Sequence, residues 1–122
     1  MQLTLSSLFT ALALALSLAG SAFGDSYGDS CHNQRISRGV LHAECLDRDD
    51  GRVQTQLDLN NCVAFQSGRL GCDGHGGFAD DCDVNTCLLV GGTTMNCICE
   101  QRYPAVVNLG RCIQNDNGQL GC

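Results

Sequence analysis

The chain has 122 residues and a formal net charge of −6, with 13 acidic residues against 7 basic ones, all of them arginine. This charge argues against a nucleic-acid or anionic membrane ligand, since both carry negative charge themselves. Ten cysteines in so short a chain are typical of a secreted protein whose small core is held by disulfides.

The first 24 residues are predicted to be a secretory signal peptide. Residues 3–23 form an apolar stretch without charge, and mostly small residues at 19–24 precede Asp25. Small residues mark the cleavage site of such signals, here after Gly24. Basic residues are absent from this segment, and a membrane anchor is the alternative interpretation. We therefore expect a secreted, extracellular protein whose mature chain, 25–122, forms one small domain.

The mature chain contains an internal repeat. Residues 57–72 and 107–122 share leucines, cysteines and a Leu-Gly-Cys ending at a constant offset. Repetition at a fixed period indicates one structural unit used twice, which suits binding better than single-site catalysis. The domain divides into a first repeat, 29–72, a linker, 73–81, and a second repeat, 82–122.

Short alternating segments predict an all-β fold. Apolar and polar residues alternate at 41–45, 57–59 and 107–109, and Gly, Asn and Asp bound these segments. Alternation of this kind is typical of half-buried strands. The expected fold class is therefore all-β.

Each repeat is predicted to end in a β-hairpin. Ser67-Gly68 and Asn117-Gly118 occupy matching places, and Asn-Gly is a strong signal for a two-residue turn. Cysteines lie equally far on either side of residue 67 and of residue 117. Cysteines that face each other across antiparallel strands are close enough to bridge. This spacing predicts the disulfides Cys62–Cys72 and Cys112–Cys122.

The other six cysteines form a second pattern. A cysteine opens each repeat, and by analogy between the repeats we expect the pairs Cys31–Cys45 and Cys82–Cys99. Cys87 and Cys97 are left, and they pair as hairpin neighbours nested inside the latter bridge. The crossed arrangement, Cys82–Cys97 with Cys87–Cys99, is the alternative. A zinc site formed by the thiolates of Cys82, Cys87, Cys97 and Cys99 is disfavoured. The single residue between Cys97 and Cys99 fits the ligand spacing of a structural zinc site badly.

The linker at 73–81 contains three glycines, which make it flexible. A flexible link between similar halves permits two chains to exchange halves. We therefore expect either a monomer or a domain-swapped dimer.

The residues that recur in the two repeats form a specific pattern. In the first repeat these are Ser30-Cys31, Ile36, Val40-Leu41, Cys45, Leu57-Asp58-Leu59-Asn60 and Gly68-x-Leu70. In the second repeat they are Cys82, Met95, Cys99, Val107-Asn108-Leu109, Asn115-Asp116-Asn117-Gly118 and Leu120. In this doubled order the chain resembles the cyanovirin-N family over nearly all of 29–122. The resemblance implies a lectin fold in which each repeat supplies a three-stranded sheet and a β-hairpin that packs on the opposite half, with two carbohydrate pockets at the far ends, commonly for mannose-rich oligosaccharides.

Both pockets implied by the resemblance combine a loop of one repeat with the hairpin of the other. Their Asp, Asn and Arg side chains match the paired hydroxyls of sugars. The first pocket would use Asp29, Ser30, Asp47, Arg48, Asp49, Asn115, Asp116 and Asn117. The second pocket would use Gly77, Asp80, Asp81, Glu100, Gln101, Arg102, Phe65, Gln66 and Ser67. The second departs from the family, because Ala64 and Phe65 stand where polar residues are usual and Pro104 stiffens a short loop.

The sequence thus predicts a secreted, non-catalytic carbohydrate-binding protein without a cofactor or bound metal, whose partners are oligosaccharides or glycoproteins. No sequence motif of a catalytic triad or a phosphate-binding loop occurs in the chain. The alternative is a secreted cysteine-rich protein-interaction module, such as an inhibitor or effector, and Phe65 near a turn is its main support.

Overall fold

The computed structural model describes residues 25–73 and 75–122, so the predicted signal peptide at 1–24 lies outside the described residues. Within that part, no helix is long and apolar enough to cross a membrane. Short strands dominate, as the alternation predicts. The strands are β1 Asp25–Ser26, β2 Cys31–Ser37, β3 Val40–Leu46, β4 Arg52–Asp58, β5 Val63–Gln66, β6 Arg69–Cys72, β7 Cys82–Val90, β8 Thr94–Cys99, β9 Tyr103–Asn108, β10 Gln114–Asp116 and β11 Gln119–Gly121.

Each repeat begins with a three-stranded antiparallel sheet, β2-β3-β4 in the first and β7-β8-β9 in the second. Along β3 and β8 buried and half-buried residues alternate, because successive side chains point to opposite faces of a strand. Leu41 and Met95 lie at matching places and are fully buried. The all-β prediction is therefore confirmed.

Each sheet is followed by a 3-10 turn, Leu59–Asn61 or Leu109–Arg111. The predicted strands at 57–59 and 107–109 therefore end one residue early. In both turns the side chain before the leucine accepts a hydrogen bond from a backbone N–H two residues later, which caps the turn. The leucine itself is fully buried. The capped turn thus redirects the chain from the sheet into the hairpin.

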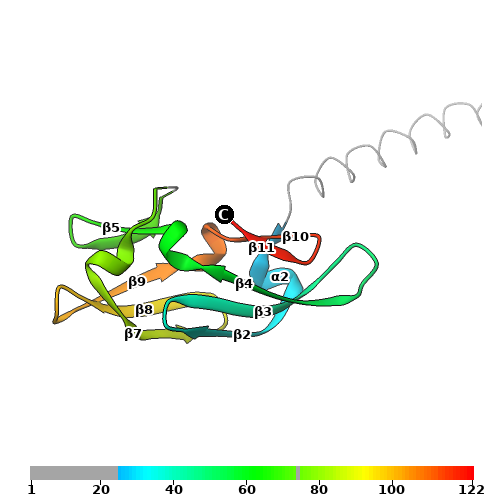
Figure 1. The fold of residues 1–122 in the computed structure, drawn as a ribbon, viewed down its shortest axis with the longest axis horizontal. Helices are drawn as coiled ribbons and strands as arrows, with labels where there is room; N and C mark the ends of the chain where they lie inside the picture. The colour runs from blue at the N-terminus through cyan, green and yellow to red at the C-terminus, as the bar shows by residue number, and fades with distance from the viewer. Residues whose placement is uncertain (1–24, 74) are drawn as a thin grey trace, which may run out of the picture.

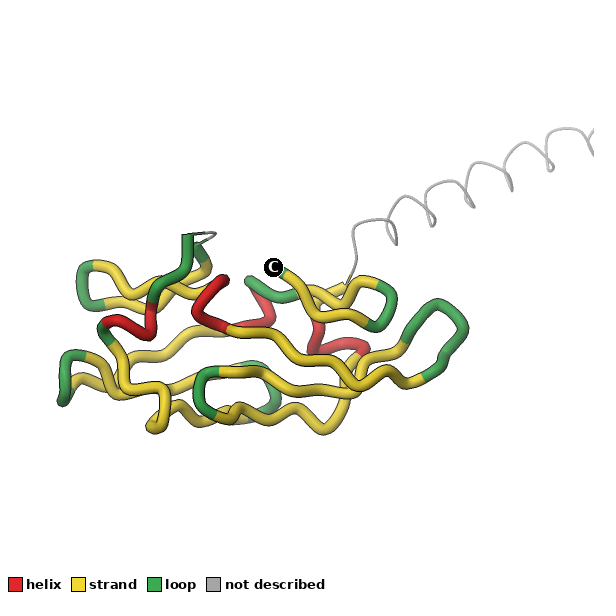
Figure 2. Tube along the Cα trace, viewed as in Figure 1, coloured by secondary structure: helices red, strands yellow, loops and turns green. Residues whose placement is uncertain are grey.

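The predicted hairpins are present as β5-β6 and β10-β11, and β1 adds a third strand to the second one. Each hairpin lies against the sheet of the other repeat: β11 contacts β4, and β6 contacts β9. Figure 1 shows the two hairpins on the same side of the molecule, toward its opposite ends. In Figure 2 two short helical segments, drawn red, lie in the middle of the molecule between the two hairpins. The halves thus clasp each other.

Two buried aromatic residues also connect the two halves. Tyr27 and Phe78 each lie four residues before the cysteine that opens a repeat, and both are fully buried. The Tyr27 hydroxyl donates a hydrogen bond to the Gly92 carbonyl of the second repeat at 2.5 Å. Phe78 lies beside Gly39 of the first repeat. Each aromatic side chain therefore packs on a strand turn of the opposite half.

Tyr27 also belongs to a four-residue helix, α2 Tyr27–Ser30, which the sequence analysis did not predict. A single helical turn is too short to show a helical period in the sequence. A third 3-10 turn, Phe78–Asp80, occupies the matching place before the second repeat. The linker before it is held to the first repeat, because Gly77 N–H donates to the Asn60 carbonyl at 2.8 Å.

Three predicted disulfides are confirmed, and they lie within the two sheets. Cys31–Cys45 and Cys82–Cys99 join the first and second strands of each sheet, and Cys87–Cys97 is nested beside the latter. The crossed alternative is therefore wrong. The four candidate zinc ligands, Cys82, Cys87, Cys97 and Cys99, are therefore all in disulfides.

The predicted pairs Cys62–Cys72 and Cys112–Cys122 are wrong. The structure has Cys62–Cys122 and Cys72–Cys112, which join the two repeats. The two-residue turn at 67–68 sets Val63, not Cys62, opposite Cys72. A shift of one residue turns a side chain to the other face of a hairpin, so the two cysteines cannot meet. The hairpin bases are bridged to each other instead.

Candidate functional site

The residues predicted for the first pocket lie together at one end of the molecule. The loop between β3 and β4 lies against the turn of the β10-β11 hairpin (Figure 1). The Arg48 backbone N–H donates to Asn117 Oδ1 at 2.9 Å across the two repeats. We call the eight predicted residues of this region the first cluster: Asp29, Ser30, Asp47, Arg48, Asp49, Asn115, Asp116 and Asn117.

Asn115 holds three segments of the first cluster together. Its amide nitrogen donates to Ser30 Oγ at 2.8 Å and to the Leu46 carbonyl at 2.9 Å. Its Oδ1 accepts from the Gly118 N–H at 2.8 Å. Asn115 is 9% exposed, so these bonds form away from bulk water, where an unpaired amide is costly. Asn115 thus positions the second hairpin against α2 and the end of β3.

Asp47 shapes the loop in the same way. Its Oδ1 accepts from the backbone N–H groups of Asp49 and Gly51 at 2.9 and 2.8 Å. These bonds close a tight loop in which Asp50 has a left-handed backbone, with φ of 61°. The two hydrogen bonds thus define the path of the loop backbone from Asp47 to Gly51.

The side chains that face water around this frame are charged. Asp29, Arg48, Asp49 and Asp116 are all exposed. They come from α2, the β3-β4 loop and the second hairpin, so both repeats contribute. Carboxylate and guanidinium groups offer paired acceptors and donors to a polar ligand.

The turn of the β10-β11 hairpin, which belongs to the first cluster, is closely packed. The equivalent turn of the β5-β6 hairpin is open. A Cβ added to Gly118 would lie 2.8 Å from Val53 Cγ2, whereas a Cβ on Gly68 would meet nothing within 4 Å. Both glycines have a left-handed backbone, with φ of 91° and 78°. Close packing of the turn therefore distinguishes the first cluster.

The second predicted pocket is not brought together as one hollow. Four of its residues, Asp80, Asp81, Glu100 and Gln101, line a hollow of about 530 Å³ with Cys82, Asp83, Thr86 and Ile98. The hairpin residues and Arg102 are not in its lining. The Arg102 guanidinium instead lies over the Tyr103 ring, 5.3 Å from its centroid.

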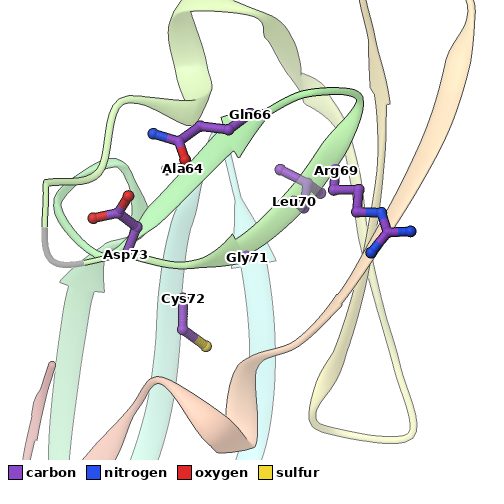
Figure 3. Close-up of a pocket in the computed structure, with 7 residues that line it drawn as sticks. All are labelled: Ala64, Gln66, Arg69, Leu70, Gly71, Cys72 and Asp73. Carbon is purple, nitrogen blue, oxygen red and sulfur yellow. The ribbon is translucent and has the colours of Figure 1, made fainter.

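The first hairpin has a hollow of its own. It measures about 270 Å³ and contains Gln66 from the predicted second pocket. Figure 3 shows Gln66 and Asp73 on one side of this hairpin, with Arg69 directed to the other. Ser67 lies at the turn with φ of 53°, and Gly77 lies in the linker with φ of 97°.

Phe65 explains why the second pocket differs. It takes the place in the first hairpin that Asn115 takes in the second, because each pairs with the hairpin leucine, Leu70 or Leu120. Phe65 is half-buried in β5 and packs against the core. A phenyl ring offers no donor or acceptor, so it cannot join hairpin and loop as Asn115 does. Its inward position also removes the main support for Phe65 as an exposed protein contact.

Comparison with known proteins identifies the family to which this fold belongs. The family of the CVNH domain matches residues 27–121. The chain belongs to the CVNH family. No curated protein matches the chain at a significant level.

Solved CVNH structures share the fold. TbCVNH from T. borchii is 32% identical, with 79% of this chain and 97% of that chain covered and a TM-score of 0.67. A designed cyanovirin-N homolog lectin is 27% identical, with 79% and 97% covered and a TM-score of 0.64. Microvirin, solved as a mannobiose complex, is 22% identical, with 80% and 97% covered and a TM-score of 0.59. The resemblance to the cyanovirin-N family is thus confirmed.

Several contacts that shape the first cluster of this CVNH chain were not predicted from the sequence. These are the Leu46 carbonyl, the packing of Gly118 on Val53, and Gly51 as a hydrogen-bond donor in the loop. The Asn-Gly pair signalled the turn but carried no information on its neighbour in the other repeat. Such contacts depend on how the halves clasp.

Proposed function

We propose that this chain is a secreted, non-catalytic lectin that binds oligosaccharides at the first cluster. The observation that carries the proposal is the hydrogen bond from Arg48 N–H to Asn117 Oδ1, which fixes two polar segments of different repeats side by side. Exposed charged side chains surround this joint. A prearranged polar surface of this kind spares a ligand the cost of ordering it.

Membership in the CVNH family supports this function, since a 27% identical homolog of designed sequence is itself a lectin. We propose mannose-type oligosaccharides as the ligand. Microvirin was solved with mannobiose, and a MoCVNH3 variant, 19% identical to this chain, was solved with (N-GlcNAc)4. A GlcNAc oligomer is therefore the comparison ligand.

The experiment is calorimetric titration of the oxidised protein with a mannose oligosaccharide and with a GlcNAc oligomer. Arg48→Ala should weaken mannose binding about tenfold, which corresponds to about 1.4 kcal/mol for a lost charged contact. Arg35→Ala is the matched control, because Arg35 is an exposed arginine on the outer side of the first sheet.

Equal loss in both variants, or no binding by the unaltered protein, would contradict the proposed function. Stronger binding of the GlcNAc oligomer would leave the site in place but overturn the mannose assignment. Arg102→Ala assigns the site, since a larger loss there than at Arg48 would move binding to the opposite end of the molecule.

A further inference from the structure

The two sheets carry different side chains on the face turned away from the core. Register makes their positions comparable: Arg35, His42 and Gln56 form a row across the first sheet, as Leu88, Asn96 and Val106 do across the second. Five outer positions are polar in the first sheet and apolar in the second: Arg35, Ser37, Glu44, Gln54 and Gln56 correspond to Leu88, Val90, Ile98, Pro104 and Val106. At the remaining outer positions of these rows the second sheet carries the polar residues Thr94, Asn96 and Asn108.

The apolar residues of the second sheet are well exposed. Leu88 is 65% exposed, Val90 54% and Val106 57%. A single exposed aliphatic residue needs no explanation, but a group on one face marks an interaction surface. An antiparallel sheet with one solvated face normally has polar residues there, and the first sheet follows this rule. The repeat thus provides an internal reference from which the second sheet departs.

This face continues into the acidic hollow. Ile98 pairs with Pro104 on the sheet and also lines the hollow of about 530 Å³. The hollow is lined by four carboxylate residues, Asp80, Asp81, Asp83 and Glu100, and by no basic residue. Among the described residues, the ion pair that forms is Arg52 with Glu44, in the other repeat. In the part of the chain that the structure describes, no basic side chain forms an ion pair with the carboxylates of the hollow.

We propose that this surface docks a polypeptide that presents basic and aliphatic side chains together. Basic side chains would enter the acidic hollow, and aliphatic ones would cover Leu88, Val90 and Val106. The opposite charge selects the partner, while burial of aliphatic carbon adds affinity. The proposal is independent of the lectin site at the other end.

The test uses three synthetic peptides of equal length with the full oxidised protein. One alternates Leu and Lys, one alternates Ser and Lys, and one alternates Leu and Glu. We expect the Leu/Lys peptide to bind at least tenfold more tightly than either of the others, because it alone supplies both chemistries. NMR shifts should fall on β7, β9 and the hollow. Equal binding of the Ser/Lys peptide would overturn the proposal, since it would reduce the effect to bulk charge.

Two variants sharpen the test without changing net charge. Leu88→Ser with Val106→Gln, which gives position 106 the residue of the first sheet, should weaken Leu/Lys binding at least tenfold. The matched control is Gln54→Ser with Gln56→Ser on the first sheet, which should leave the affinity within twofold. All four positions lie on outward faces, so circular dichroism and the disulfide map should stay unchanged.

Asp80→Asn with Glu100→Gln tests the charge and should also cost at least tenfold. Oligosaccharide titration of the Leu88→Ser, Val106→Gln variant separates this proposal from the proposed function, because that binding should be unaffected. Unchanged peptide binding in both altered variants, or shifts confined to the first sheet, would overturn the docking surface. Tighter binding of a mannose oligosaccharide than of the Leu/Lys peptide at this face would replace the polypeptide with a sugar.

Discussion

Single side chains decide how the two ends of the molecule differ. Asn115 joins hairpin, loop and helix at one end, whereas Phe65 fills the same place at the other and packs inward. The sequence showed that a polar residue was replaced by an aromatic one. It did not show that Asn115 was the joint, because its partners at Ser30 and Leu46 lie 85 and 69 residues away.

Gly118 and Gly68 offer a matched test of the packed turn. Alanine is strained at both positions because φ is positive, which costs about 1 kcal/mol. At 118 the added methyl group also meets Val53, so Gly118→Ala should lower the free energy of unfolding by about 2–4 kcal/mol in total. Denaturant unfolding of the two variants measures the difference. Equal losses would show that the turn is not packed on Val53.

Tyr27 gives the protein a predictable response to alkaline pH. Burial raises the pKa of Tyr27 to about 12 from its usual 10. The unfolded chain therefore loses this proton first, and between pH 10 and 12 the folded state binds more protons than the unfolded state. The free energy of unfolding must fall as pH rises through this window, by about 1–2 kcal/mol, and the full contribution is present below pH 10.

Tyr27→Phe isolates this effect. It should lower stability at pH 8, because the Gly92 carbonyl loses its donor, at a cost of about 1–2 kcal/mol. It should also flatten the decline between pH 10 and 12. Thermal unfolding of both proteins across this range measures the two effects, and an equally steep decline in the variant would assign the response to another group.

At the scale of elements, the repeat and the packing of each hairpin on the opposite half were predictable, but the disulfides between the hairpins were not. Alternation placed Leu41 and Met95 on the buried face, and glycine-containing turns located both hairpins. The disulfide error arose because the position of Cys62 was counted from one residue, while the turn occupies two. Symmetry within one hairpin also hid the observed solution, in which the first cysteine of each hairpin pairs with the second cysteine of the other.

The bridges between hairpins should control how firmly the hairpins stay docked. Cys72→Ser with Cys112→Ser opens a 40-residue separation and should cost about 3–4 kcal/mol. Amide hydrogen exchange should then rise in β5-β6 and β10-β11. The comparison variant, Cys87→Ser with Cys97→Ser, removes a bridge inside one sheet and should raise exchange in β7 and β8 instead. Unaltered hairpin exchange in the first variant would contradict this role.

For the whole molecule, the same bridges constrain any exchange of halves. Each hairpin packs on the opposite repeat, so in a swapped dimer Cys62 and Cys122 would come from different chains. The oxidised monomer should therefore stay monomeric on concentration, as measured by sedimentation equilibrium. Protein that is reduced, concentrated and then reoxidised should include dimers that survive denaturing electrophoresis without reductant. A dimer formed from oxidised monomer would contradict this constraint.

The central claim is that the clasp of two repeats builds an oligosaccharide site at the first cluster. The most direct measurement is residue-by-residue NMR titration of the oxidised protein with a mannose oligosaccharide. The account predicts saturable shifts at 47–51 and 115–118, in segments that are remote in sequence but joined between Arg48 and Asn117. Absence of saturable shifts, or shifts restricted to the opposite end around Asp80 and Glu100, would contradict it.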